Sequence, residues 1–163
     1  MNIAEVLRLL AETYPKLDEL SAGVSGQQLL APLGPGERSF IETLVHILNC
    51  ESRTFEAITL ALLASEPLLT TIHAERDFGK LFRFERMPFS DLLAYFKFRR
   101  TVLLRVLKDL NEKQWSRVIR QEGKQRKESV YWQARGQALH ELEHVLDIEG
   151  KLSPKADQPN TTE

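Results

Sequence analysis

His140 and His144, two of the chain's four histidines, stand four residues apart. On an α-helix, residues i and i+4 lie one turn apart on the same face, so both imidazoles can reach a single metal ion. In a helical projection at ~100° per residue, the side chains of His140, His144 and His46 point away from the middle of the nearby apolar stripe. The spacing leaves two interpretations open: surface histidines, or metal ligands that face a cleft beside the core.

The segment from His140 to His144 also matches the H-E-x-x-H motif, in which Glu141 would be the general base of a zinc peptidase. A peptidase of this class needs a further metal ligand downstream, where only Asp147 and Glu149 are available. The chain is also short for such an enzyme. The peptidase interpretation is therefore the weaker one.

The composition limits the classes of protein to which the chain can belong. It has 163 residues, 42% hydrophobic and 28% charged, with a net charge of -1, which is typical of one globular domain with a buried core. The single cysteine, Cys50, excludes an internal disulfide and fits a reducing compartment. No apolar run approaches the ~20 residues that span a bilayer, and Glu5 and Glu12 interrupt the only candidate signal peptide. We expect a cytoplasmic protein with no membrane segment.

Four segments with apolar residues at helical spacing must position these histidines. We expect helices over residues 3–17, 39–64, 90–111 and 129–149, the second carrying His46 and the fourth carrying the histidine pair. Little of the chain alternates with period two. The pattern therefore predicts an all-α fold, a four-helix bundle in up-and-down order with a long connection between the second and third helices.

Glycines, prolines and caps predict where these helices begin and end. We expect Pro15 to kink the first helix or to start another, Ser90 to cap the third, and Gly150 to end the fourth. Gly136 lies inside the fourth helix, where glycine costs helix propensity, so we expect close packing there. The bundle domain should cover residues 1–152, followed by a polar, disordered tail over 153–163.

Three short motifs share their order and spacing with a known family. They are the second-helix segment His46-Ile47-Leu48-Asn49-Cys50-Glu51, an F-x-x-x-R-x-x-x-L pattern at Phe96, Arg100 and Leu104, and the fourth-helix segment from His140 to Ile148, which is close to H-(D/E)-x-x-H-x-x-Q-I. On these motifs the chain resembles the DinB/YfiT-like superfamily of four-helix-bundle metalloproteins, from about residue 4 to about residue 150. Two positions depart from the family pattern: Arg38 replaces a tryptophan, and Asp147 replaces a glutamine.

The resemblance implies a metal centre. Its ligands would be His46, His140 and His144, which would hold one divalent ion, zinc or nickel, and leave coordination positions open. Glu51 and Asp147 are candidate orienters of these ligands. Two further residues carry weaker signals. Cys50 follows His46 by one turn but is better explained as a small, partly buried apolar residue, and His73 matches no ligand position and is expected on the surface.

The resemblance also bears on function. Family relatives transfer low-molecular-weight thiols, such as bacillithiol or mycothiol, to electrophiles. It therefore implies a metal-dependent thiol S-transferase with a small thiol and an electrophile as substrates. The alternatives are a metal-dependent hydrolase and a non-enzymatic, stress-related interaction module. A homodimer is also implied.

One segment is strongly cationic. Residues 97–127 hold eleven Lys or Arg and three acidic residues, a local net charge of +8. Such a segment can attract an anionic thiol, a phosphate or a nucleic acid. Because no aromatic residues are interleaved for base stacking, a solvated helix face with a loop is the better explanation, and nucleic acid is not expected as a partner.

Overall fold

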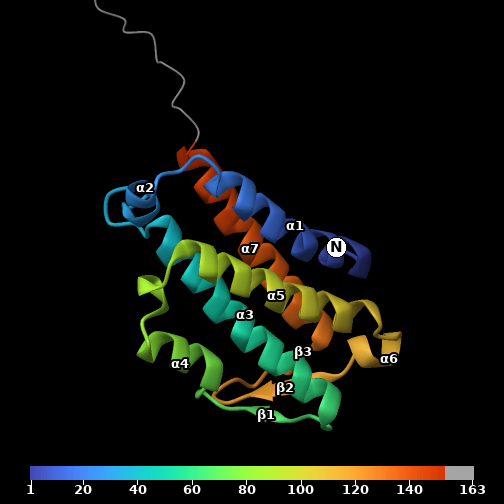
Figure 1. Ribbon diagram of the computed structural model, residues 1–163. Coiled ribbons are helices and arrows are strands. Elements are labelled where there is room, and N and C mark those ends of the chain that lie inside the picture. The colour runs from blue at the N-terminus through green and yellow to red at the C-terminus, as the bar shows by residue number, and fades with distance from the viewer. Residues whose placement is uncertain (153–163) are drawn as a thin grey trace, which may run out of the picture.

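The computed structural model describes residues 1–152 as a mostly helical bundle with a small sheet at one end (Figure 1). The four long helices are α1 (Ile3–Ser21), α3 (Phe40–Leu63), α5 (Phe89–Lys108) and α7 (Val130–Leu152). The predicted four-helix bundle is therefore confirmed, whereas the predicted tail, 153–163, lies outside the described residues. None of the described helices is long and apolar enough to cross a membrane.

The order of the helices differs from the predicted up-and-down bundle. α1 and α3 each pack against α5 and α7, so they lie across the bundle from each other (Figure 1). α3 and α5 run in the same direction, because Phe40 at the start of one contacts Phe89 at the start of the other, with ring centroids 5.1 Å apart. α1 and α7 are also parallel, since the Tyr131 hydroxyl donates a hydrogen bond to the Met1 carbonyl. The up-and-down order is wrong because the long connection after α3 returns the chain to the end at which α3 began.

Short elements fill the connections between the long helices. The helical ones are α2 (Gly26–Leu30), α4 (Ala74–Leu81), a 3-10 turn (Phe84–Arg86) and α6 (Glu112–Trp115). The strands are β1 (Leu68–Leu69), β2 (Val118–Gln121) and β3 (Glu128–Ser129). β2 pairs in parallel with β1 and antiparallel with β3. Strands of two to four residues are too short to show an alternating pattern, so the sequence did not predict this sheet.

Three of the expected helix boundaries are also corrected. α1 continues through Pro15 as one helix, so the expectation that Pro15 starts another helix is wrong, while a kink at Pro15 stays a prediction. α5 begins at Phe89 rather than after Ser90, and α7 continues through Gly150.

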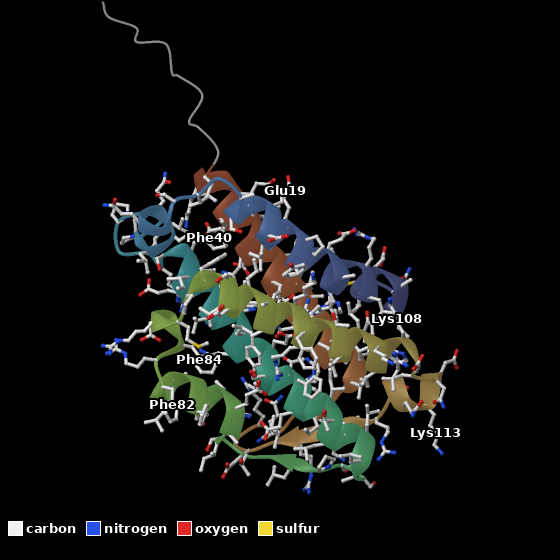
Figure 2. All side chains as sticks on the ribbon, viewed as in Figure 1. Glu19, Phe40, Phe82, Phe84, Lys108 and Lys113 are labelled. Atoms are coloured by element: carbon white, nitrogen blue, oxygen red, sulfur yellow. The ribbon has the colours of Figure 1, made fainter. Side chains whose placement is uncertain are left out.

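The long connection between α3 and α5 is anchored on the outside of the bundle. Phe84 places its ring 6.3 Å from that of Tyr95 on α5, while Phe82 is exposed at the outer end of α4 (Figure 2). α4 packs on α3, and His73, just before α4, places Nδ1 2.7 Å from Oε2 of Glu56. The expectation that His73 is a surface residue is wrong: it is only 3% exposed, because the connection folds back over α3.

A layer of buried polar side chains separates two apolar clusters of the core. Arg100 of α5 donates hydrogen bonds to Glu51 of α3 (Nε to Oε1, 3.0 Å) and to Glu141 of α7 (Nη1 to Oε2, 2.8 Å). On α1, the Leu10 carbonyl accepts from Arg100 at 2.6 Å, and the Thr13 hydroxyl donates to Glu141 at 2.9 Å. Each of the four long helices thus contributes to this buried polar layer.

The charges in this layer are unequal, because two carboxylates face one guanidinium. Burial raises the pKa of Glu51 to about 7, although the charge of Arg100 opposes this shift. Within residues 1–152, Oε2 of Glu51 has no hydrogen-bond partner. Loss of Arg100 would leave both carboxylates buried without a counter-charge, which is one of the costliest changes in a protein core.

We therefore predict that Arg100→Leu lowers the free energy of unfolding by about 3–5 kcal/mol. Urea denaturation near pH 7.5 measures this difference. The matched control is Arg8→Leu, which removes an exposed ion pair with Glu12 and should cost at most ~0.5 kcal/mol. An equally small loss in Arg100→Leu would contradict the role assigned to the buried layer.

Candidate metal centre

One histidine of α3 and two histidines of α7, far from it in the sequence, meet between these helices. His46 lies in the first half of α3, and His140 and His144 lie near the middle of α7, which packs antiparallel to α3. Nε2 of His140 is 3.1 Å from Nε2 of His46 and 3.1 Å from Nε2 of His144. The three ligand atoms all lie within 4.8 Å of one another. The structure therefore brings together the three residues that the sequence singled out.

These distances fit a metal ion better than a hydrogen-bonded cluster. Nε2 of His140 has one in-plane position, which holds either a proton or a lone pair, so it cannot form good hydrogen bonds to both neighbours. One cation can accept lone pairs from all three nitrogens. Tetrahedral coordination with Zn–N bonds of 2.0–2.1 Å separates the ligand nitrogens by about 3.3 Å, close to the 3.1 Å found for two of the pairs. The donor set suits zinc or another divalent transition metal.

The surroundings keep His46 and His144 in the neutral form that binds metals. Burial is the main cause that lowers the pKa of His46 to about 4, and the charge of Arg38 adds to it. Burial also lowers the pKa of His144, with His140 and Arg38 as further causes. Arg38, one of the two departures from the family pattern, thus helps to keep two of the three histidines neutral near pH 7.

Cys50 lies beside the three histidines but outside their cluster. Its Sγ is 3.9 Å from Nε2 of His46, and burial raises the pKa of the thiol. The ligand atoms that lie within 4.8 Å of one another are those of His46, His140 and His144. The three histidines are therefore the candidate ligands.

Neither predicted orienting carboxylate forms a hydrogen bond with these histidines. Glu51 binds Arg100 in the buried layer, and Asp147 accepts from Lys151 (Nζ to Oδ2, 2.7 Å) on the surface. Within the part of the chain that the structure describes, Nδ1 of His140 is buried and has no partner. An orienting role for Glu51 and Asp147 stays a prediction.

Glu141 is not placed to act as a general base, so the peptidase interpretation is wrong. Its side chain is fully buried and accepts hydrogen bonds from Arg100, Thr13 and Gln137. Because consecutive helix residues point about 100° apart, the helix that turns His140 outward turns Glu141 into the core. The segment matches the H-E-x-x-H sequence, but its glutamate does not occupy the position of a general base.

A cavity of about 240 Å³ opens beside His140. Its lining includes Arg53, Lys124, Trp132 and Gly136, which sequence reasoning did not assign to the site. The available signal was the spacing of Trp132, Gly136 and His140, each four residues from the next on α7. The expectation of close packing at Gly136 is wrong, because no neighbouring element lies within 4 Å of the position that a Cβ atom would take. A larger groove, about 530 Å³, lies between α1 and α7 but reaches none of the histidines.

Much of the cationic segment binds other parts of the chain. Arg117 donates to the carbonyls of Ala61 and Ala64 at the end of α3, at 2.5 and 2.6 Å. Lys127 forms an ion pair with Glu66 at 2.6 Å, while Arg100 belongs to the buried layer. These contacts use several of the segment's charges to hold the end of α3 and the start of the long connection.

Comparisons with known proteins agree with this fold. A family model described as the DinB superfamily matches residues 9–148. Among solved structures, YfiT from Bacillus subtilis superposes with a TM-score of 0.80 at 16% sequence identity, over 91% of this chain and 85% of that one. It is described as "a probable metal-dependent hydrolase with an unusual four-helix bundle topology". A search of curated proteins finds no significant match. Since the family model covers most of its length, the chain belongs to the DinB superfamily.

Proposed function

We propose that this protein is a metal-dependent enzyme in which His46, His140 and His144 hold one zinc or nickel ion. The observation that carries the proposal is the convergence of three imidazoles next to an open cavity. A buried structural metal would have no such cavity at its side. The placement therefore favours a centre that admits a substrate.

The ligand set determines the chemistry. When bound, a divalent ion with three neutral ligands keeps its full charge and open positions, and so lowers the pKa of a thiol or water that it takes up. The chain supplies the rest of the site. Arg53 and Lys124 in the cavity attract an anionic substrate.

The reaction we propose is transfer of a small thiol to an electrophile. The thiol sulfur forms a bond to the electrophilic carbon, the thiol proton passes to solvent, and the leaving group departs with its electron pair. Two features support a thiol: the family resemblance of the histidine motifs, and the cationic lining of the cavity, which suits a thiol that carries carboxylates.

Hydrolysis is the second candidate. It is favoured by the structural match to YfiT, which is itself described as a probable metal-dependent hydrolase. The same three histidines would serve this reaction, with water in place of the thiol as the nucleophile. The two reactions differ in whether activity requires an added thiol.

We expect the purified chain to carry about one zinc or nickel ion, and His144→Ala to weaken metal affinity by at least ~100-fold, because it removes a ligand rather than an outer contact. Metal analysis and competition with a chelator measure both quantities. Cys50→Ala is the matched control and should retain the metal. Retention in His144→Ala, or the absence of uptake by the native chain, would refute the centre.

We further expect the metal-loaded protein to accelerate the reaction of a small thiol with 1-chloro-2,4-dinitrobenzene, releasing chloride. The rate should fall to background after chelation and recover when metal is restored. Hydrolysis of p-nitrophenyl acetate without thiol tests the alternative in parallel. Metal-dependent ester hydrolysis with no thiol transfer would replace the first reaction by the second, and the absence of both would favour an interaction module.

A further inference from the structure

The cavity beside His140 has features that neither the helix nor the metal ligands require. Trp132, Gly136, His140 and His144 follow one another at four-residue intervals and so form a single stripe along α7. Gly136, in the middle of this stripe, destabilises the helix relative to alanine. Its backbone is not in the left-handed region, and a Cβ atom at this position would meet no neighbouring element within 4 Å. Neither packing nor backbone conformation explains the glycine, whereas open space next to a metal ligand does.

The charges around this space are mostly positive. Arg53 lines the cavity, and its Nη2 donates to Oε1 of Gln121 at 2.8 Å, which fixes the guanidinium at the wall. Lys124 lines the same cavity and has no ion-pair partner in the part of the chain that the structure describes. The lining contains one carboxylate, that of Glu128, whose Oε2 accepts from Gln133 at 2.7 Å.

Two further cations lie next to the cavity. The guanidinium carbons of Arg126 and Arg135 are 5.5 and 5.1 Å from the centre of the Trp132 ring. Two cations and one carboxylate thus line the cavity, and two more cations lie near the Trp132 ring at its wall. Such a field attracts anions, and Arg53 with Lys124 can bind a carboxylate directly.

We propose that this cavity binds a small organic acid, whose carboxylate contacts Arg53 and Lys124, whose body lies over Gly136, and whose reactive group faces His140. The volume of about 240 Å³ suits a small molecule rather than a peptide segment. The proposal rests on the proposed function for the identity of the reactive group: for thiol transfer, the ligand is a thiol that carries a carboxylate.

The test compares 3-mercaptopropionate with neutral 2-mercaptoethanol on the cobalt(II)-loaded protein, with the thiolate-to-cobalt absorption band as the measure of binding. We expect the anionic thiol to bind at least ~10-fold more tightly, which corresponds to one hydrogen-bonded charge contact. The double variant Arg53→Gln/Lys124→Gln should bind the two thiols within ~2-fold of each other. Lys108→Gln, a cation at the end of α5 (Figure 2), is the control and should keep the preference.

Two substitutions at Gly136 provide an independent test. Gly136→Ala should raise the melting temperature by about 2–4 °C, because alanine favours the helix. Gly136→Leu should fill the space over the stripe and weaken the binding of 3-mercaptopropionate at least ~10-fold. Unchanged affinity in Gly136→Leu, or equal binding of both thiols by the native protein, would overturn the proposal.

Calorimetric titration with propionate, which has no thiol, separates this proposal from the proposed function. If neither thiol changes the cobalt spectrum but propionate binds in an Arg53- and Lys124-dependent way, the carboxylate site stands and thiol transfer fails. If both thiols bind without preference, thiol transfer stands and the carboxylate site fails. If propionate and both thiols fail to bind, both proposals fail.

Discussion

The rest of the structure depends on Arg100, because its guanidinium donates hydrogen bonds to Glu51 of α3, Glu141 of α7 and the Leu10 carbonyl of α1. This buried layer fixes the register of α3 against α7. Since Glu141 directly follows His140 and lies one turn before His144, holding its carboxylate in the core turns both imidazoles toward His46. A core built only of apolar side chains would hold the helices together, but it would define their register less strictly.

The metal centre depends on the antiparallel packing of α3 and α7. Because α3 and α7 are antiparallel neighbours, one histidine from the first half of α3 meets two from the middle of α7. The site lies at the flank of the bundle rather than on its axis, so its other side is free for a cavity. Burial keeps His46 and His144 neutral, and the cations around the cavity favour anions. One flank of the bundle therefore combines a metal-binding face with a site for an anionic substrate.

Local sequence patterns predicted much of the fold and of the metal centre, and contacts between residues far apart in the sequence account for the features that these patterns missed. The four long helices follow from apolar periodicity, and the ligand set follows from spacing together with family motifs. The burial of His73 depends on Glu56 of α3, and the parallel run of α3 and α5 depends on a connection with no strong pattern. The buried role of Glu141 was not predicted, because its neighbours in sequence match a catalytic motif while its partner Arg100 is 41 residues away. The position of Arg100 on the buried face of α5, between Phe96 and Leu103, was the signal that could have identified that partner.

X-ray absorption at the zinc edge of the zinc-loaded protein tests the central claim most directly, because it reports the atoms bound to the ion. The account predicts imidazole nitrogens from three histidines at about 2.0–2.1 Å, with the remaining position held by an exchangeable light atom. A sulfur at about 2.3 Å in the absence of added thiol would place Cys50 in the ligand set and contradict the account. A shell without imidazole would contradict it as well.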